Sequence, residues 1–206
     1  MTRCGVLALQ GAFIEHVQLL SALGVDTVQV RRPDQLSGLD ALIIPGGEST
    51  SVGKLAVAYG LVEPIRRMAQ EGFPIWGTCA GMILLARDVG FGQPLLGVMD
   101  IVVRRNAFGR QVDSFEVGLD IPVLRTVSTG AECGRPFPGL FIRAPLVERL
   151  GPAAEALARL PDDVRIAGQA GAVVAARQGK LVATAFHPEL TGDSRFHRYF
   201  LAVAGS

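Results

Sequence analysis

The sequence is poor in cysteine and histidine, and neither type shows the spacing of a metal or disulfide site. None of the three cysteines or three histidines forms a CxxC, HxH or HxxxH pair: they are Cys4, Cys79, Cys133, His16, His187 and His197. An odd, sparse cysteine count is typical of a reducing cytoplasm and argues against a disulfide framework or a zinc site. We therefore expect a cytoplasmic protein that holds no metal.

The sequence also lacks an excess of charge of either sign and lacks a long hydrophobic run. Its 20 Lys and Arg residues balance 19 Asp and Glu residues, which argues against binding to nucleic acid or to a membrane surface. The longest stretch without a charged residue, residues 72–86, contains Pro74 and falls short of the roughly 20 apolar residues that a spanning helix needs. The N-terminal residues show no signal-peptide pattern, so we assign the apolar surplus to a buried sheet.

No internal repeat, low-complexity tract or linker divides the chain, so we expect one domain over residues 1–206. Short apolar runs alternate with helical patterns, which predicts an α/β fold of three layers: a mainly parallel twisted sheet with helices on both faces. The segment 101–141 has the pattern of antiparallel strands and loops. The other predicted strands are residues 4–9, 25–30, 41–44, 74–77, 164–167, 172–177 and 181–186, and the predicted helices are residues 13–23, 49–59, 62–71, 80–87 and 193–204.

The segment Gly77-Thr78-Cys79-Ala80-Gly81 has the form G-x-nucleophile-x-G, between an apolar strand and an apolar helix. Its two glycines allow a tight strand-to-helix turn that lifts the cysteine out of the sheet. The turn places the sulfur at a helix N-terminus, where partial positive charge favours a thiolate, and directs the Ala80 N–H at a developing oxyanion. The alternative is a buried structural cysteine, which is the ordinary fate of a free cysteine. We favour the catalytic interpretation.

A nucleophilic cysteine needs a base, and the candidate is His187, which follows the last predicted strand. A loop after that strand can carry His187 to the carboxyl edge of the sheet, where doubly wound folds place their sites. Glu189, two residues further on, can contact the imidazole and fix its tautomer and orientation. A lone histidine near a strand end is more often plain loop structure, but Glu189 and the cysteine motif together favour a Cys79–His187–Glu189 triad.

The segment PGGEST at residues 45–50 directly follows another strand. The adjacent Gly46 and Gly47 expose backbone N–H groups and let the chain approach a ligand closely, which suits the second half of an oxyanion hole. Ser49 or Thr50 can cap the helix that follows. The alternative is a bare strand–loop–helix junction. A phosphate loop is disfavoured, because the G-K-[ST] ending of the Walker pattern is absent.

In this order, the three motifs resemble those of class I glutamine amidotransferases, with their G-x-C-x-G elbow and late H-P-E. More narrowly, the chain resembles the glutaminase subunits of pyridoxal 5′-phosphate synthase complexes. The stretches that carry this resemblance span nearly the whole chain: residues 5–11 (GVLALQG), 45–50 (PGGEST), 77–81 (GTCAG), 104–116 (RRNAFGRQVDSFE), 141–145 (FIRAP) and 186–190 (FHPEL). The stretches at 104–116 and 141–145 are the most specific, since many amidotransferases share the triad motifs.

The resemblance implies a flavodoxin-like fold and a glutaminase that frees ammonia from L-glutamine. The ammonia would pass to a synthase subunit that makes pyridoxal 5′-phosphate (vitamin B6). No metal or organic cofactor is required for this half of the chemistry, because pyridoxal 5′-phosphate would be the product of the whole complex. Cys79 would be the nucleophile, with His187 and Glu189 as its partners.

The oxyanion hole is assigned to Gly46, Gly47 and Ala80. The resemblance further implies glutamine contacts from residues of three separate stretches: Gly47, Glu48, Ser49, Arg105, Ile142 and Arg143. An arginine fork suits the free α-carboxylate of glutamine, which it can grip through two charge-assisted hydrogen bonds. The alternative for either arginine is a solvated surface charge.

Three further features have more than one interpretation from the residues alone. Gln10 and Gly11 resemble the family's loop near the oxyanion hole, but by themselves they form a strand-end turn. Glu15 and His16 lie on the first predicted helix, whose family counterpart faces the synthase subunit; without the resemblance both are expected to be solvated. The loop at residues 125–138 is longer than expected for the family, and is either a tolerated surface insertion or a segment that alters access to the glutamine site.

Two other functions fit the same fold. A different amidotransferase subunit would serve another synthase, and the stretches at 104–116 and 141–145 argue against it. A non-catalytic binding or regulatory protein belongs to another class, and the intact set of Cys79, His187 and Glu189 argues against that.

Overall fold

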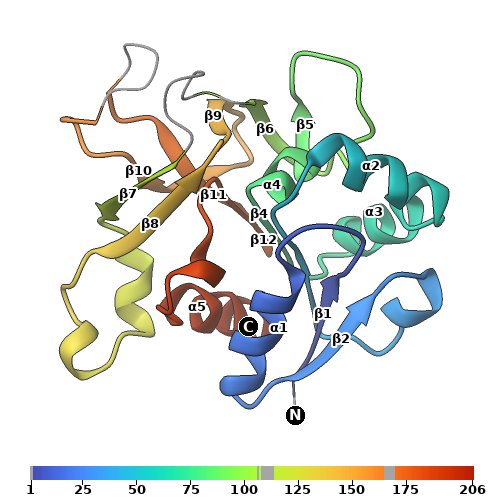
Figure 1. Cartoon of the computed structure of the whole chain (residues 1–206), viewed down its shortest axis with the longest axis horizontal. Coiled ribbons are helices and arrows are strands. Elements are labelled where there is room, and N and C mark those ends of the chain that lie inside the picture. The colour runs from blue at the N-terminus through green and yellow to red at the C-terminus, as the bar shows by residue number, and fades with distance from the viewer. Residues whose placement is uncertain (1, 106, 108–113, 165–169) are drawn as a thin grey trace.

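The computed structural model describes residues 2–105, 107, 114–164 and 170–206. A ten-stranded sheet runs through its centre, and one half of that sheet is parallel (Figure 1). The parallel strands lie in the order β2 (Asp26–Val30), β1 (Arg3–Leu7), β3 (Ala41–Ile44), β4 (Ile75–Thr78) and β12 (Leu181–Thr184). The strands predicted at these places are confirmed to within a few residues, and the predicted fold class is confirmed with them.

The other half of the sheet is mostly antiparallel. From β12 it continues through β11 (Val173–Gln178), β9 (Leu146–Leu150), β6 (Met99–Arg104) and β5 (Ala86–Asp88), with β10 (Glu155–Arg159) paired to β11. A separate antiparallel pair is formed by β7 (Ser114–Leu119) and β8 (Phe137–Ile142). The antiparallel character predicted for residues 101–141 is therefore confirmed. The strand predicted at residues 164–167 lies largely outside the described residues, and β9 and β10 were not predicted.

Helices cover both faces of the parallel strands (Figure 1). On one face lie α1 (Phe13–Ala22) and α5 (Arg195–Ala204), and on the other lie α2 (Ser49–Ala58), α3 (Val62–Gln70) and α4 (Ala80–Leu85). The connections between parallel strands are right-handed, so the direction in which the chain moves along the sheet decides which face the connecting helix covers. The chain moves one way from β1 to β2 and the opposite way from β3 to β4, so α1 lies on one face and α2 and α3 lie on the other. The helix predicted to end at residue 87 ends at Leu85, and the next residues form β5. Short 3₁₀ turns lie at Pro33–Leu36, Pro122–Thr126, Gly130–Glu132 and Pro188–Leu190.

The core is centred on strands that are buried along their whole length. Every residue of β3, β4 and β12 is buried, as expected for central parallel strands covered on both faces. Trp76 of β4 is fully buried, stacks on Phe196 at 5.1 Å and donates its indole N–H to the Thr184 hydroxyl at 3.2 Å. Replacing such a side chain with alanine costs about 3–5 kcal/mol, so this strand is held firmly in place.

The register of the central strands decides where the predicted motifs meet. Strand β4 pairs Thr78 with Thr184 of β12 on one side and Gly77 with Ile44 of β3 on the other. Because parallel strands end at the same edge, the loops after β3, β4 and β12 emerge side by side at the carboxyl edge of the sheet. Doubly wound folds bind their ligands at this edge.

The loop at residues 125–138 is anchored to α5. The Arg195 guanidinium donates to the carbonyl oxygens of Glu132 at 3.2 Å and Arg135 at 2.7 Å, and Arg198 pairs with the Glu132 carboxylate at 2.6 Å. None of this loop's residues lines the pocket that contains Cys79. The structure therefore favours the surface insertion over a segment that controls access.

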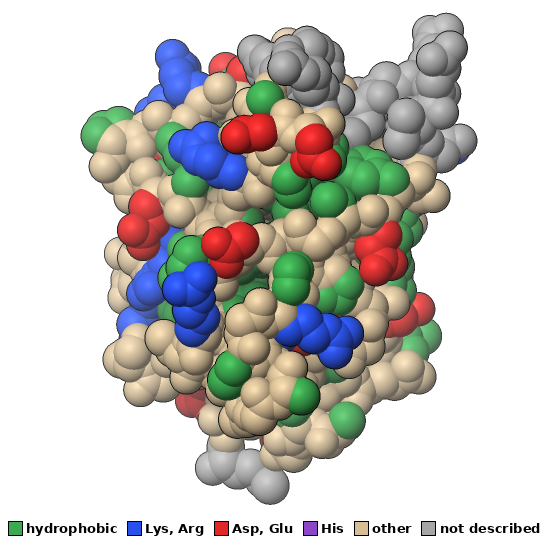
Figure 2. All heavy atoms as spheres, turned by 90° about the vertical axis from the view of Figure 1, so that its left-hand side faces the viewer, with side chains coloured by type: hydrophobic (Ala, Val, Ile, Leu, Met, Phe, Trp, Pro, Cys, Tyr) green, Lys and Arg blue, Asp and Glu red, His purple; other side chains and the backbone are tan. Residues whose placement is uncertain are grey.

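Acidic and basic side chains lie interspersed on the face shown in Figure 2, as the balanced composition leads us to expect. Within the described residues, no helix combines the length and the apolar character needed to span a bilayer.

Candidate active site

Cys79 occupies a strained turn between β4 and α4. Its φ of 48° is in the left-handed region, which a residue with a side chain rarely adopts and which recurs at functional sites. A methyl group on Gly77 would lie 2.4 Å from the backbone of Gly81, and one on Gly81 would lie 2.0 Å from the Ile44 carbonyl oxygen. Both glycines of the motif are therefore required by close backbone approach, and the predicted strand–nucleophile–helix turn is present.

His187 and Glu189 follow β12 and lie at the same edge as Cys79. The His187 Nδ1 lies 2.7 Å from Oε1 of Glu189, and both side chains are buried. The backbone N–H of His187 donates to the Leu140 carbonyl oxygen of β8 at 2.8 Å, so a second sheet fixes the start of this loop. The predicted orientation of the imidazole by Glu189 is thus matched by the geometry.

The surroundings of His187 favour its charged form. Burial is the largest single influence and opposes the charge, but hydrogen bonds with Cys79 and Glu189, together with their negative charges, raise the pKa of His187 to about 10. A carboxylate behind the ring and a thiol in front of it is the arrangement that stabilises an imidazolium beside a thiolate. The site can therefore hold a nucleophilic sulfur and a proton donor together.

The three residues assigned to the oxyanion hole lie around Cys79. Ala80 follows it directly at the start of α4, and a methyl group on Gly46 would lie 3.4 Å from the Cys79 Cβ and 2.4 Å from Cε1 of His187. The Gly46 carbonyl oxygen accepts from the Ala12 N–H at 3.1 Å. Since the C=O and N–H of a trans peptide point in opposite directions, the Gly47 N–H points away from Ala12.

A pocket of about 500 Å³ opens beside the sulfur of Cys79. All the predicted site residues line it except Ala80 and Glu189, which are buried behind it. The lining consists of Gly11, Ala12, Gly46, Gly47, Glu48, Ser49, Cys79, Ile83, Arg105, Ile142, Arg143, His187 and Leu190. Such a volume is within the range of pockets for small molecules. The proximity of residues 10–11 to this site agrees with the resemblance, because the Gln10 side-chain oxygen also accepts from the Glu48 N–H at 2.8 Å.

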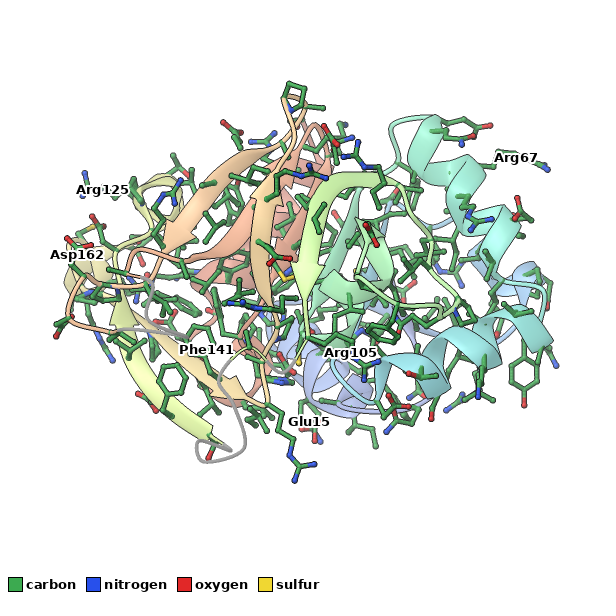
Figure 3. The ribbon with its side chains drawn as sticks, turned by 90° about the horizontal axis from the view of Figure 1, so that it is seen from above. Glu15, Arg67, Arg105, Arg125, Phe141 and Asp162 are labelled. Atoms are coloured by element: carbon green, nitrogen blue, oxygen red, sulfur yellow. The ribbon has the colours of Figure 1, made fainter. Side chains whose placement is uncertain are left out.

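Arg105 reaches the pocket from the end of β6 and is held by several partners. Figure 3 shows it in the middle of the molecule, whereas Arg67 and Arg125 lie at the periphery. Its guanidinium donates to Gln93 at 2.8 Å, and lies 3.2 Å from the Glu48 carboxylate. Arg105 is therefore not a solvated surface charge. Its position in the lining of the pocket is consistent with the other interpretation, a contact with glutamine.

Glu48 serves as the N-cap of α2. Its carboxylate accepts from the N–H groups of Thr50 at 3.0 Å and Ser51 at 2.7 Å. Hydrogen bonding from Ser51, with further bonds from the Thr50 and Ser51 backbone, lowers the pKa of Glu48 to about 2 despite some burial. The prediction that Ser49 or Thr50 caps this helix was wrong, because the longer Glu48 side chain reaches back to the same N–H groups.

Ile142 and Arg143 enter the pocket from the end of β8. The Ile142 carbonyl oxygen lies 3.9 Å from the sulfur of Cys79. Arg143 has a φ of 45°. Like Cys79, it therefore has a left-handed backbone although it carries a side chain. Strained backbone conformations of this kind cluster at ligand-binding segments, so the strain at Arg143 is consistent with a role of residues 142–143 in binding.

Two residues of the site region were missed or misjudged from the sequence. Gln93 accepts from Arg105 and from the hydroxyls of Ser49 and Thr50, at 3.3 Å for each hydroxyl. Its position after a glycine-containing turn gives no signal of this role. His16 was expected to be solvated but is fully buried against Glu189. Its helical spacing from the buried Leu20 was the available signal.

Other parts of the predicted site cannot be placed. Residues 106 and 108–113, which belong to the stretch RRNAFGRQVDSFE, lie outside the described residues.

In the described part of the chain, no three His, Cys, Asp or Glu side chains are grouped as ligands of a metal ion would be.

The fold and the cysteine elbow define a class I glutamine amidotransferase, and comparisons with known proteins agree. A crystal structure of a glutamine amidotransferase superposes with a TM-score of 0.85 at 49% identity, covering 98% of this chain and 99% of the other. PurLQS from Thermotoga maritima shares the fold alone, at 16% identity and a TM-score of 0.69, with 98% of each chain covered.

The chain belongs to the SNO glutamine amidotransferase family, whose family model matches residues 6–204. It is 59% identical over 203 residues to the pyridoxal 5′-phosphate synthase subunit PdxT of Herpetosiphon aurantiacus, covering 97% of this chain and 98% of that protein. It is 57% identical over 204 residues to the PdxT subunit of Moorella thermoacetica, covering 98% of this chain and all of that protein.

Proposed function

We propose that this chain is the glutaminase subunit of a pyridoxal 5′-phosphate synthase. It hydrolyses L-glutamine to L-glutamate and ammonia, and passes the ammonia to a synthase partner. The observation that carries the proposal is the placement of Cys79 beside the buried His187–Glu189 pair, at the edge of a 500 Å³ pocket. High identity over nearly the full length of proteins named as subunits of that synthase supports the same conclusion.

In the proposed reaction, the Cys79 thiolate attacks the side-chain carboxamide carbon of glutamine. The Ala80 N–H and the Gly46–Gly47 backbone stabilise the negative oxygen of the tetrahedral intermediate. His187 gives its proton to the nitrogen, the C–N bond breaks, and ammonia leaves behind a γ-glutamyl thioester. His187 then takes a proton from water, which attacks the thioester carbon and releases glutamate and the cysteine thiolate.

Glutamine is held by the charged rim of the pocket. Arg105 and Arg143 supply guanidinium groups for the α-carboxylate, and an arginine fork binds a carboxylate more specifically than a single ammonium does. Glu48, Ser49 and the Ile142 backbone complete the proposed contacts, and all of these residues line the same pocket. Glu48 also pairs with Arg105, so ligand binding and the shape of the α2 N-terminus are linked.

The remaining parts of the proposal concern the whole chain. We assign residues 1–206 to one glutamine amidotransferase domain, supported by a family match over residues 6–204. We place the protein in the cytoplasm, in keeping with its unpaired Cys4, Cys79 and Cys133. The glutaminase reaction uses side chains and water, and it needs no cofactor.

The test is steady-state release of glutamate from glutamine by the purified chain, with and without the synthase subunit of the same organism. Turnover that requires Cys79, together with transfer of nitrogen to the synthase product, supports the proposal. No turnover in either case would make this a non-catalytic protein on the same fold. Turnover without stimulation or nitrogen transfer would indicate a subunit of a different synthase.

A further inference from the structure

Two histidines that the proposed mechanism does not use lie against the triad from behind. His16 of α1 and His197 of α5 are both fully buried, and the His16 Nδ1 lies 2.9 Å from the His197 Nε2. Both rings also meet the Trp76 indole edge to face, at 5.6 Å and 4.9 Å. The His197 Nδ1 has no hydrogen-bond partner among the described residues, so the bond between the two rings is the one polar contact recorded for His197.

The second face of His16 points at Glu189. The His16 Nε2 lies 3.4 Å from Oε2 of Glu189 and 3.3 Å from the Thr78 hydroxyl, and neither the His16 nor the Glu189 side chain is exposed. The other carboxylate oxygen, Oε1, is the one that faces His187. Among the described residues, Oε2 has no hydrogen-bond partner, and its 3.4 Å contact with His16 is an ion-pair distance rather than a formed hydrogen bond. The His16 Nε2 therefore lies within ion-pair distance of a buried carboxylate oxygen that has no hydrogen bond among the described residues.

The protonation of the two rings follows from these partners. A carboxylate only accepts hydrogen bonds, so the His16 Nε2 must carry a proton for a favourable contact with Glu189. Burial, with like-charge effects from His197 and His187, lowers the pKa of His16 well below its ordinary value, so the ring is neutral and its Nδ1 accepts. His197 then donates through Nε2. The His197 Nε2 thus donates to the His16 Nδ1, and the protonated His16 Nε2 faces both the Thr78 hydroxyl and Oε2 of Glu189.

We propose that His16 is a positioning residue that orients the Glu189 carboxylate, so that its Oε1 stays in the plane of the His187 ring. This inference rests on the proposed function, because it concerns the same triad. Oε1 is bonded to His187, and closing the His16 contact gives Oε2 a partner as well, so that the carboxylate cannot then rotate about its terminal bond without losing one of them. A contact of 3.4 Å is long in the free chain, and such bonds shorten when the site is occupied.

The position of His16 also connects the triad with the opposite wall of the site. Helix α1 begins just after Ala12, whose N–H holds the Gly46 carbonyl, and His16 lies one turn further along the same helix. A shift of α1 would therefore move both the glycine loop and the support of Glu189. Through Ala12 and His16, α1 is therefore connected both to the glycine loop and to the carboxylate behind the catalytic base.

The test compares His16→Leu with His16→Gln in the complex with the synthase subunit. Leucine fills the space but has no donor, whereas the glutamine amide can place an N–H near the former Nε2. We expect His16→Leu to lower kcat about tenfold with little change in the KM for glutamine, since the donor that closes on Oε2 in the occupied site is lost. We expect His16→Gln to restore most of the rate.

A spectroscopic measurement separates positioning from simple packing. The Nδ1 proton of His187, which is bonded to Glu189, gives a far-downfield NMR resonance that should shift upfield or broaden in His16→Leu and return in His16→Gln. Leu20→Ala is the matched control, because Leu20 is equally buried on α1 but has no polar atom with which to hydrogen-bond Glu189. This control should lower thermal stability while leaving kcat and the resonance unchanged.

Two outcomes would overturn the inference. One is a wild-type rate and resonance in a folded His16→Leu variant. The other is equal loss in His16→Leu, His16→Gln and Leu20→Ala, which would indicate packing alone. Failure of the proposed function would differ from both, because then the wild-type complex itself would not hydrolyse glutamine.

Discussion

The backbone N–H of Cys79 donates to the carbonyl oxygen of Thr184 at 2.7 Å. This bond joins the strand that carries the nucleophile to the strand that leads to His187, one residue beyond the regular β4–β12 pairing of Thr78 with Thr184. A slip of one residue in this pairing would reverse which side chains face the site. The register of two central strands therefore decides whether sulfur and imidazole meet.

We predict that Cys79 alone among the three cysteines is essential. Cys79→Ala should abolish glutamate release, because it removes the nucleophile. Cys4→Ala should keep most of the activity, since Cys4 lies in the core of β1, where burial raises the pKa of its thiol to about 12. Cys133→Ala should also stay active, because this residue is exposed on the loop tied to α5. Substantial turnover by Cys79→Ala would refute the triad assignment.

A second prediction separates the roles of His187 and Glu189. His187→Ala should reduce kcat about a thousandfold or more, whereas Glu189→Gln should reduce it about ten- to a hundredfold, because the amide oxygen can still accept from the ring. Loss of the carboxylate charge should also lower the pKa of His187, which the bond to Glu189 helps to raise. NMR titration of the ring measures that change. Equal, complete loss in both variants, with intact circular dichroism, would instead give Glu189 a stronger electrostatic role.

Gly46 offers a test of how tightly the site is packed. A methyl group there would lie 2.4 Å from Cε1 and 3.0 Å from Nδ1 of His187, so Gly46→Ala must displace the ring. We expect kcat to fall about a hundredfold, as is usual when a catalytic group moves by about an ångström. Gly92→Ala is the matched control, because a methyl group at Gly92 meets nothing within 4 Å. Equal activity in the two variants would show that His187 tolerates displacement.

The central strands and the triad could be predicted from the sequence because their signals are local. The run Ala41–Ile44 is wholly apolar and ends at Pro45, and the structure has β3 at those residues. Strands β9 (LVERL) and β10 (EALAR) escaped prediction, because charged residues interrupt both runs and their partners are distant along the chain. These segments become strands because they pack against neighbouring strands of the sheet, and their own sequences carry little strand preference.

The supporting contacts of the site could not be predicted, because they join distant parts of the chain. His16 and His197 are 181 residues apart, and Gln93 meets Ser49 across 44 residues. A polar residue on a helix is most often solvated, and only the tertiary fold reveals that His16 lies between Trp76 and Glu189. The four-residue spacing of His16 from the buried Leu20 is consistent with burial on one helix face, but spacing alone does not separate a buried histidine from a solvated one.

The buried histidines also predict how stability depends on pH. Burial lowers the pKa of His197 to about 3 and that of His16 well below 6.5, whereas both rings take up protons near pH 6.5 in the unfolded chain. The unfolded state therefore binds more protons below that pH. The stabilisation is fully present above about pH 6.5. The His197 ring reduces the free energy of unfolding by about 1.4 kcal/mol per pH unit as the pH falls toward 3, and the His16 ring acts in the same direction.

The variant His197→Gln isolates this effect, since carboxylates titrate in part of the same range. Its amide can still donate to His16 but does not titrate. Urea unfolding of the wild type and the variant between pH 4 and 6 should give a slope that is smaller by about 1.4 kcal/mol per pH unit in the variant. Identical slopes would mean that His197 is protonated in the folded protein, against the neutral pair deduced for His16 and His197.

We expect the chain alone to be nearly silent and to be switched on by the synthase partner. Ammonia released into water near neutral pH is mostly ammonium, which has no lone pair with which to attack a carbonyl. Hydrolysis without a docked acceptor would therefore lose the nitrogen. A partner can activate the site only by binding the active conformation more tightly than the silent one. Full activity of the isolated chain, unchanged by saturating synthase subunit, would refute gating.

The Gly46–Gly47 peptide is the gate that we predict, and the bond from the Ala12 N–H to the Gly46 carbonyl must break for it to flip. Ala12→Pro removes that donor at a residue whose φ of −82° lies near the proline value. If the bond holds the silent state, the variant should raise the rate of the isolated chain about two- to tenfold, which is the net worth of one hydrogen bond. The rate with saturating synthase should change little. Ala12→Ser keeps the N–H and should behave as the wild type, and an unchanged ratio of the two rates in Ala12→Pro would place the gate elsewhere.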